Sequence, residues 1–224
     1  MTKKLFITGT GTDVGKTYIS ALILKKLRAA KLNAGYYKAA VSGADDNGEN
    51  DASFVARTAG INDVPIDELV SYRYKEAVSP HLAAKLNNRP IEWSKVAEDF
   101  AKAKARHDYV LVEGSGGIVC PLREDAGETL LLEALPIRLN LPALIVANAQ
   151  LGSINAAVLT VCYLQNKNIS VKGIIVNNYD DSSVMERDNV YMMEKLTKVD
   201  VVATLPCGAQ DFAESAEKIA GWFG

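Results

Sequence analysis

Cysteine and histidine are scarce in this sequence of 224 residues. The three cysteines, Cys120, Cys162 and Cys207, lie far apart and form no CxxC pair, and the two histidines, His81 and His107, are also widely separated. This spacing argues against a metal site built from histidine and cysteine. An odd number of dispersed cysteines predicts reduced thiols, as expected of a cytoplasmic protein.

The sequence also lacks a large net charge and a long apolar run. Lys and Arg number 25 against 27 Asp and Glu, so charge gives no reason to expect a nucleic acid or an anionic membrane as partner. The first apolar run is far too short for a signal-peptide core, and no later stretch approaches the roughly 18 apolar residues of a membrane span. With 48% hydrophobic and 23% charged residues, the composition predicts a globular protein, and we expect residues 1–224 to form one α/β domain.

Apolar runs alternate with helical patterns along the chain. Strands are expected at 4–9, 33–41, 71–74, 109–113, 142–149, 171–178 and 201–206. Helices are expected at about 16–30, from 51 after a polar loop at 42–50, at 79–88, 91–108 and 153–166, between the last two strands, and after the last strand. Because most of these strands are continuous Val, Ile and Leu, they are expected to be buried on both faces. We therefore predict a doubly wound, mostly parallel sheet with helices on both faces and ligands at the carboxyl ends of its strands.

A glycine-rich stretch, TGTGTDVGKT at 8–17, lies between the first expected strand and the first expected helix. Glycines let backbone N–H groups surround a phosphate, and the helix N-terminus favours negative charge. In a P-loop NTPase-like fold, Lys16 would reach the β- and γ-phosphates of a nucleotide and the Thr17 hydroxyl would bind Mg²⁺. The strict GxxxxGK[ST] pattern requires glycine at position 10, where this chain has threonine between two glycines. The alternative is a glycine-rich turn followed by a surface lysine.

Three further charged residues lie where ligands of such a fold bind. Glu113 ends the run YVLVE and would bind Mg²⁺ or be a solvated strand end. Asp51 begins a helix and would be a second Mg²⁺ ligand, or Asn50 or Asp51 would be a plain helix cap. Lys38 lies in an apolar strand, where a lysine is costly unless it meets a charge. It would be a second cation beside the transferred phosphoryl group, or its amine would reach the surface.

Two polar stretches are ambiguous. SPHLA predicts a helix start, with Ser79 as cap and Pro80 at the first helical position, and makes His81 a surface or core residue more readily than a catalyst. Asn177 and Asn178 follow an expected strand and would either hydrogen-bond the edge of a base or make a turn.

Together these motifs resemble the dethiobiotin synthetases, the ATP-dependent carboxylases of biotin synthesis. The matching stretches are TGTGTDVGKT (8–17), YKAAVSG (37–43), ENDA (49–52), SPHLA (79–83), VLVEGSGG (110–117), LGSINAAVLT (151–160), GIIVNN (173–178) and LP (205–206). They occur in the order of the family and span most of the chain. Many ATPases share the phosphate loop, whereas YKxxxSG, SPH, VEGxGG and LGxIN in this order are far more specific.

The resemblance implies a homodimeric, cytoplasmic ligase that uses ATP and Mg²⁺ to join CO₂ to 7,8-diaminononanoate, also called 7,8-diaminopelargonate. One amine of the diamine would capture CO₂ as a carbamate. ATP would phosphorylate the carbamate to a carbamic–phosphoric anhydride, and the second amine would close the ring. The products would be dethiobiotin, ADP and phosphate, with no nucleic acid or membrane involved.

The resemblance also implies roles for the residues at matching positions. The catalytic residues would be Lys38, which would stabilise the carbamate, Lys16 and Thr12. The Mg²⁺ ligands would be Thr17, Asp51 and Glu113. The nucleotide would contact Asp13, Val14, Gly15, Lys16, Thr17, Tyr18, Asp51, Glu113, Gly114, Ser115, Gly116, Asn177, Asn178 and Pro206. The diamine would contact Ser42, Leu151, Gly152, Ser153 and Asn155, the last four at a helix N-terminus that reaches the substrate carboxylate across the dimer interface.

The chain departs from the common family pattern at a few positions. Ala39 replaces a frequent proline, Asp13 a frequent glutamate, Ser115 a common alanine and Gln150 an occasional lysine, and LPCG lacks the aromatic residue that some members place after the proline. None of these changes removes a group that the chemistry needs.

Three other functional classes fit the sequence less well. A related amidoligase would need a glutamine-hydrolysing domain, for which 224 residues leave no room. A partition or nitrogenase-iron type of switch ATPase would need a second lysine five residues before Lys16, where this chain has Gly11. A nucleotide-binding protein without catalysis is disfavoured by the presence together of Lys16, Thr17, Lys38 and Glu113.

Overall fold

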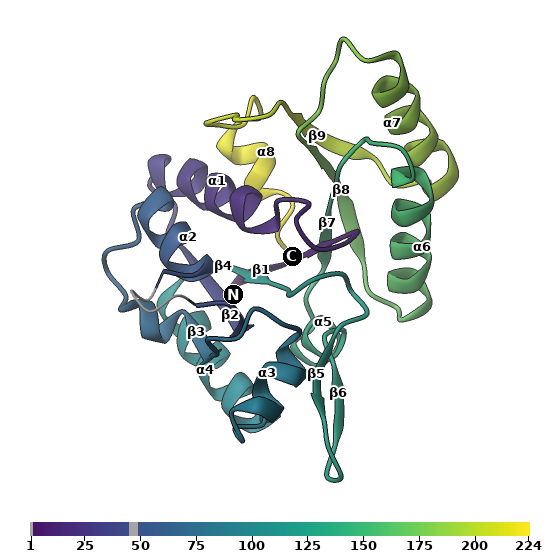
Figure 1. The fold of residues 1–224 in the computed structure, drawn as a ribbon. Coiled ribbons are helices and arrows are strands. Elements are labelled where there is room, and N and C mark those ends of the chain that lie inside the picture. The colour runs from purple at the N-terminus through teal and green to yellow at the C-terminus, as the bar shows by residue number, and fades with distance from the viewer. Residues whose placement is uncertain (1, 45–48) are drawn as a thin grey trace.

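A parallel β-sheet forms the centre of the computed structural model, which describes residues 2–44 and 49–224 (Figure 1). Within these residues the sheet has seven strands in the order β3-β2-β4-β1-β7-β8-β9, and every neighbouring pair is parallel. Its strands are β1 (Lys3–Gly9), β2 (Ala34–Val41), β3 (Val70–Arg73), β4 (Tyr109–Glu113), β7 (Ala143–Ala147), β8 (Val171–Asn177) and β9 (Val201–Leu205). The predicted parallel sheet is therefore confirmed. Positions 45–48 of the expected polar loop lie outside the described residues.

Helices cover both faces of this sheet (Figure 1). The buried residues of one face come from α1 (Lys16–Ala29), α2 (Asp51–Ala59) and α8 (Ala216–Ala220). Those of the other face come from α3 (Pro80–Leu86), α4 (Trp93–Arg106), α5 (Ala134–Leu139), α6 (Ser153–Asn166) and α7 (Val184–Thr197). A short 3₁₀ turn, η1 (Ile66–Glu68), precedes β3. The doubly wound arrangement predicted from the sequence is confirmed.

The alternation of side chains along β1 explains why its sequence is apolar throughout. Leu5 and Ile7 are fully buried in the core beneath α1, whereas Phe6 is fully buried in the core on the opposite face. Successive side chains of a strand point to opposite faces, so a central strand needs apolar residues at every position. Each such side chain contributes about 1.5–3 kcal/mol of hydrophobic stabilisation.

The sequence analysis did not predict a small hairpin and a short helix after β4. The hairpin consists of β5 (Pro121–Glu124) and β6 (Thr129–Leu131), which pair antiparallel and project away from the main sheet, and α5 follows it (Figure 1). Asp125 holds the turn, because its Oδ1 accepts hydrogen bonds from the backbone N–H groups of Gly127 at 2.8 Å and Glu128 at 3.1 Å. The expected helices near 79–88 and 91–108 are present but shorter.

The strand order brings three carboxyl ends together. β4 lies between β1 and β2, so Gly9, Val41 and Glu113 end neighbouring strands at one edge of the sheet. After β1 the chain forms β2 and β3 on one side of β1 and returns to β4 beside it. It then forms β7, β8 and β9 on the other side of β1. Such a change of direction leaves a crevice in which doubly wound proteins bind their ligands.

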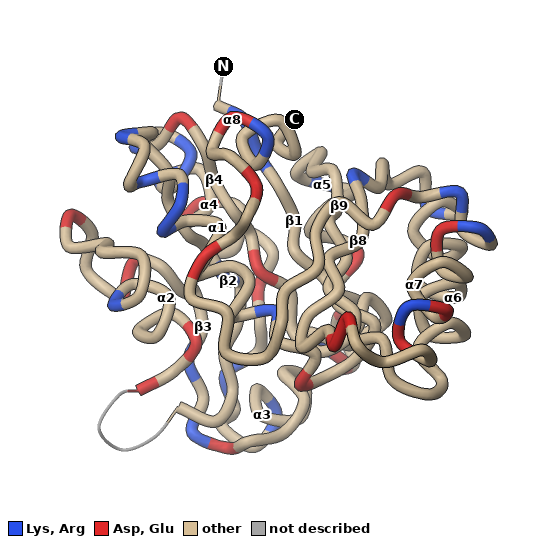
Figure 2. The backbone as a smooth tube through the Cα atoms, turned by 90° about the horizontal axis from the view of Figure 1, so that it is seen from above, with Lys and Arg blue, Asp and Glu red and all other residues tan. Residues whose placement is uncertain are grey.

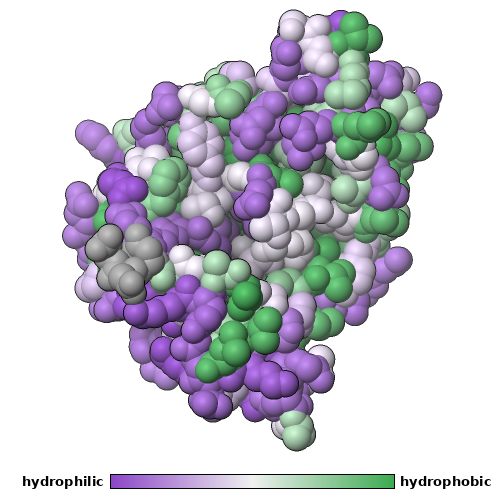
Figure 3. Space-filling view, viewed as in Figure 1, coloured by the Kyte–Doolittle hydropathy of each residue, from purple (hydrophilic) through white to green (hydrophobic). Residues whose placement is uncertain are grey.

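Charged and apolar residues are distributed differently over the surface. Acidic and basic residues are interspersed around the outside of the chain (Figure 2). Exposed apolar residues on the face shown in Figure 3 lie over α3 and, among polar residues, along the side formed by α6 and α7. The exposed side chains of the α6–α7 side include Leu151, Leu159, Val184, Tyr191 and Leu196. None of the helices that the structure describes has the length and apolar character needed to cross a membrane.

Candidate active site

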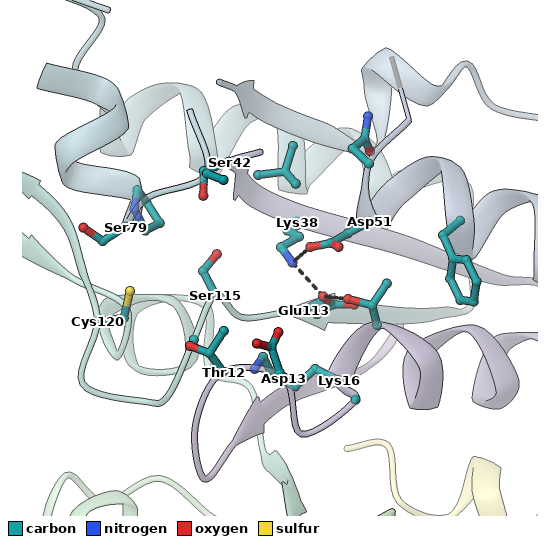
Figure 4. A pocket seen from close by; sticks show the side chains of 18 of the residues that line it. Thr12, Asp13, Lys16, Lys38, Ser42, Asp51, Ser79, Glu113, Ser115 and Cys120 are labelled. Carbon is teal, nitrogen blue, oxygen red and sulfur yellow. Dashed lines mark hydrogen bonds and ion pairs between the residues drawn. The ribbon is translucent and has the colours of Figure 1, made fainter. Parts of the chain in front are cut away.

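A cavity of about 1000 Å³ opens at the carboxyl ends of β1, β2 and β4. Its walls come from the loop between β1 and α1, the ends of β2 and β4, the start of α2 and the segment that precedes α3 (Figure 4). Most of the polar groups that the sequence predicts for the phosphates and for Mg²⁺ meet in this cavity.

The loop between β1 and α1 depends on a left-handed glycine and leaves the start of α1 without a side-chain cap. Gly15 has φ of 95°, and a Cβ atom there would lie 2.1 Å from Nδ2 of Asn177. Asn177 is buried and donates a hydrogen bond to the Val14 carbonyl at 3.1 Å, so it supports the loop from the end of β8. Because Gly15 has no side chain with which to cap α1, the first N–H groups of this helix remain available to a ligand.

Lys16 lies at the start of α1 with its amine turned toward the loop. Its Nζ donates a hydrogen bond to the Gly11 carbonyl at 2.8 Å, and the residue is only 7% exposed. Burial lowers the pKa of Lys16, and the nearby positive charge of Lys38 lowers it further. A phosphate oxygen would be a stronger acceptor than the loop carbonyl, since both partners would then be charged.

Lys38 lies between two carboxylates in the cavity (Figure 4). Its Nζ is 2.6 Å from Oε1 of Glu113 and also forms an ion pair with Oδ2 of Asp51. Burial acts to lower the pKa of Lys38, but the charges of Glu113 and Asp51 outweigh it and raise the pKa above its ordinary value. At 3% exposure, Lys38 does not reach the surface, so the alternative of a solvated lysine is wrong.

The simpler alternatives for Glu113 and Asp51, a solvated strand end and a helix cap, do not describe these two residues. Glu113 is 1% exposed, so it is not a solvated strand end. Asn50 is the N-cap of α2, because its side chain accepts hydrogen bonds from the backbone N–H groups of Ala52 and Ser53. Asp51 is therefore not the cap, and its carboxylate points into the cavity toward Lys38.

The donor set of the cavity fits a Mg²⁺ ion. The Thr17 hydroxyl donates to Oε1 of Glu113 at 2.8 Å, and Asp51 lines the same cavity. These groups are hard oxygen ligands, which Mg²⁺ prefers. Within the described residues, no three His, Cys, Asp or Glu side chains cluster around one point. A cation here would therefore take its remaining ligands from phosphate oxygens and water, as is usual for Mg²⁺ in nucleotide sites.

Tyr36 is a member of this site that the sequence analysis missed. Its hydroxyl donates to Oε2 of Glu113 at 3.1 Å, and the residue is 1% exposed. Burial and the charge of Glu113 raise the pKa of Tyr36 well above its ordinary value, so it stays a donor. The signal was available, because Tyr36 and Lys38 are two positions apart in an expected strand and therefore share a face.

The structure separates the predicted site residues into groups. Those that line the cavity are Thr12, Asp13, Gly15, Lys16, Thr17, Tyr18, Lys38, Ser42, Asp51, Glu113, Ser115 and Gly116. Val14 is buried in the core, and Gly114 packs against Phe6. The predicted residues that do not line the cavity are Val14, Gly114, Asn177, Asn178, Pro206, Leu151, Gly152, Ser153 and Asn155.

The predicted substrate-binding residues at the start of α6 and in the loop before it lie together outside the cavity. Asn189 of α7 donates to the Ala149 carbonyl at 2.7 Å and so holds this loop. Leu151 is 89% exposed, and Gly152 has φ of 90°. Ser153 is buried, and its hydroxyl has no hydrogen-bond partner within the described part of the chain. Because no side chain caps α6, the first N–H groups of this helix are suited to an anion such as a carboxylate.

Comparisons with known proteins identify relatives along nearly the whole chain. A family model described as an AAA domain matches residues 3–210. A protein of Brachyspira hyodysenteriae named ATP-dependent dethiobiotin synthetase BioD is 46% identical over 202 residues, which cover 90% of this chain and 91% of the relative. A protein of the same name from Clostridium botulinum strain 657 is 51% identical over 193 residues, which cover 84% of each chain.

A solved structure shares the fold at much lower sequence identity. The ParA family ATPase of Chlorobium tepidum superposes with a TM-score of 0.54 and 16% identity, covering 92% of this chain and 85% of the other. This likeness shows a P-loop NTPase-like fold alone. Fold alone does not specify a function, whereas the relatives at 46–51% identity indicate the family of this chain.

Proposed function

This chain belongs to the ATP-dependent dethiobiotin synthetase family, and from that membership we infer that it is a ligase that forms dethiobiotin with ATP in biotin biosynthesis. We propose that the cavity at the ends of β1, β2 and β4 holds the reaction. The substrates would be 7,8-diaminononanoate, CO₂ and ATP. The observation that carries the proposal is the position of Lys38 between Asp51 and Glu113, beside the phosphate loop.

The phosphate loop and the start of α1 would bind the triphosphate of ATP. Lys16 would exchange the Gly11 carbonyl for a phosphate oxygen, and the free N–H groups of α1 would donate to the same phosphates. Val14 and Gly114 would contribute through their backbone, since the Val14 side chain is buried and Gly114 has none. Asn177, Asn178 and Pro206 lie outside the cavity at the ends of β8 and β9, where the base would extend.

Thr17, Asp51 and Glu113 would hold Mg²⁺ beside these phosphates. Their oxygens come from α1, α2 and β4 and meet at one wall of the cavity. When bound, Mg²⁺ would offset the negative charge of the phosphates. With Mg²⁺ bound to Asp51 and Glu113, the Lys38 amine would turn from these two carboxylates toward the substrate. In the structure this amine lies between them.

The chemistry needs positive charge more than it needs a general base. A carbamate is an anion that must attack the γ-phosphoryl group of another anion, so the main barrier is charge repulsion and positioning. Lys16 and Lys38 both present ammonium groups to the cavity and would stabilise this charge. Thr12 lines the same cavity near the phosphate loop and would orient the reacting groups. The second amine, delivered neutral, would then close the ring and release phosphate.

The diamine would extend away from the phosphates along the cavity wall. Ser42 lines the cavity at the end of β2 and would contact the amines. The carboxylate at the other end of the diamine would need a separate site, and Leu151, Gly152, Ser153 and Asn155 offer one at the start of α6. Because these residues do not line the same chain's cavity, we propose that they reach it from a second copy of the chain.

A homodimer is supported by the exposed apolar side chains of α6, of α7 and of the loop before α6. Leu151 and Leu159 are 89% and 61% exposed, and Tyr191 on α7 is 56% exposed. Such exposed apolar groups are typical of protein interfaces. The main sheet takes strands from positions 3 to 205, which supports treating residues 1–224 as one domain of each subunit. A cytoplasmic location remains a prediction.

The function is tested by following the carbon atom of CO₂. The purified chain is incubated with Mg-ATP, ¹³C-labelled bicarbonate and 7,8-diaminononanoate, and the product is analysed by mass spectrometry and ¹³C NMR. We expect a cyclic urea whose carbonyl carbon carries the label. Hydrolysis of ATP without a labelled urea would contradict the proposal.

A further inference from the structure

The two oxygens of the Glu113 carboxylate have different partners. Oε1 accepts hydrogen bonds from the Thr17 hydroxyl at 2.8 Å and from the Lys38 amine at 2.6 Å. Oε2 accepts from the Tyr36 hydroxyl at 3.1 Å. One oxygen thus contacts two groups that line the cavity, Thr17 and Lys38, and the other contacts Tyr36, which is buried behind it.

Tyr36 can hold Oε2 firmly because its own position is fixed. β2 and β4 are neighbouring parallel strands, and their register pairs Lys38 with Glu113 and Tyr36 with Leu111. Tyr36 and Lys38 are two positions apart, so both project from the same face of β2. The Tyr36 ring is fully buried in the core beneath α1 and α2, among residues that include Ile19.

We propose that Tyr36 is a positioning residue that makes Glu113 a one-oxygen ligand and so favours Mg²⁺ over Ca²⁺ at the cation site. Mg²⁺ requires near-octahedral geometry with short bonds, whereas the larger Ca²⁺ accepts carboxylates through both oxygens. A cation in the cavity would take the place of the Thr17 and Lys38 donors at Oε1, whereas Tyr36 is buried in the core and keeps Oε2. Without the hydroxyl, the carboxylate can turn and offer both oxygens. This inference rests on the proposed function, in which Thr17 and Glu113 hold the cation.

The test compares the wild-type chain with Tyr36→Phe, which keeps the ring and removes the hydroxyl. Calorimetry measures the affinity for ADP at increasing concentrations of Mg²⁺ or Ca²⁺, so the readout requires no turnover. The ratio of the two apparent metal affinities is the metal preference. Partners that orient a metal ligand typically alter metal affinity by about 10–100-fold, so we expect the preference for Mg²⁺ to fall by about tenfold or more.

Tyr37→Phe is the matched control. Tyr37 is also fully buried and adjacent in β2, but its hydroxyl makes hydrogen bonds with Ser71 Oγ at 2.7 Å and the Val96 carbonyl at 3.0 Å. Its side chain lies in the core of the opposite face. This variant loses a buried hydroxyl of the same strand without touching Glu113, so we expect an unchanged metal preference even if its thermal stability falls.

Each outcome decides the inference. A tenfold loss of Mg²⁺ preference in Tyr36→Phe alone supports it. A wild-type preference in Tyr36→Phe, or an equal loss in Tyr37→Phe, overturns it and leaves the proposed cation site intact. ADP binding by the wild-type chain that does not respond to either metal overturns the cation site of the proposed function, and the inference with it.

Discussion

The Lys38 amine lies 2.6 Å from Oε1 of Glu113, and the register of β2 and β4 pairs these two residues directly. Both side chains are almost completely buried. A buried ion pair is weak grounds for stability, because removing two charges from water costs about as much as their attraction returns. The pair is therefore better explained by the charge it presents to the cavity, which Lys16, Asp13 and Asp51 also line.

Replacing Lys38 by methionine removes the amine and keeps most of the side-chain volume. We expect turnover to fall by about a thousandfold, because one preorganised group that stabilises developing charge is typically worth about 10²–10³-fold. ADP binding should change little, since Lys16 and the phosphate loop remain. Steady-state ADP release and calorimetric titration with ADP measure the two effects. Wild-type turnover in Lys38→Met would remove Lys38 from the mechanism.

The same substitution tests the energetics of the buried charge. Lys38→Met leaves Glu113 buried without its cation, so the free energy of unfolding should fall by about 3 kcal/mol. The double variant Lys38→Met/Glu113→Gln removes the charge and should recover part of this loss of stability without restoring turnover. Urea denaturation of both variants provides the comparison, and equal stabilities would show that Thr17 and Tyr36 alone satisfy the carboxylate.

Gly15→Ala is expected to damage the phosphate loop. The residue has φ of 95°, and its new Cβ would lie 2.1 Å from Asn177 Nδ2. The combined strain should cost about 2 kcal/mol of folding free energy and weaken ADP binding. Gly11→Ala is the control, because no described atom lies within 4 Å of a Cβ at that position. Equal stability and ADP affinity in both variants would contradict this account of the loop.

His107 makes stability depend on pH. It is buried beside Gly35, its Nδ1 lies 2.9 Å from Asn33 Oδ1, and burial lowers its pKa below the ordinary value of 6.5. Below pH 6.5 the unfolded chain therefore binds a proton more readily than the folded chain. The free energy of unfolding should accordingly decrease as pH falls from about 7.5 to about 5.5.

Substitution isolates the contribution of this histidine. His107→Gln should reduce the loss of stability between about pH 7.5 and about pH 5.5, as followed by urea midpoints. An unchanged pH dependence in His107→Gln would assign the effect to other groups.

Leu159→Glu tests the proposed dimer. Leu159 is 61% exposed on α6, so an added charge should leave the fold of one chain intact while opposing contact with a second copy. We expect light scattering to show a monomer and the KM for the diamine to rise, because the start of α6 would no longer reach the partner's cavity. Leu86→Glu on α3, at a residue 58% exposed, should remain dimeric. A dimeric Leu159→Glu would place the interface elsewhere.

The main sheet could be predicted because its information is local. Each central strand is a continuous apolar run, as in Leu5, Phe6 and Ile7, and each run is followed by a helical pattern. The phosphate loop is equally local, since Gly15 and α1, which begins at Lys16, are contiguous. The conformation of such segments is indicated by residues that are neighbours in the sequence, so it can be predicted without knowledge of the tertiary contacts.

The missed features are either very short elements or contacts between residues far apart in the sequence. The β5–β6 hairpin has strands of four and three residues, too short for a clear periodicity, and its turn is fixed by Asp125. Tyr36 meets Glu113 across 77 positions. Asn177 was predicted to contact the nucleotide base, and its hydrogen bond to Val14 beneath the phosphate loop became visible only in the structure.

The most direct test of the central claim is the release of ADP from the purified chain with Mg-ATP and bicarbonate, with and without 7,8-diaminononanoate. The account predicts release that requires the diamine and forms one cyclic urea for each ADP. Release at the same rate without the diamine, or none with it, would contradict the assignment and return the chain to the class of switch ATPases.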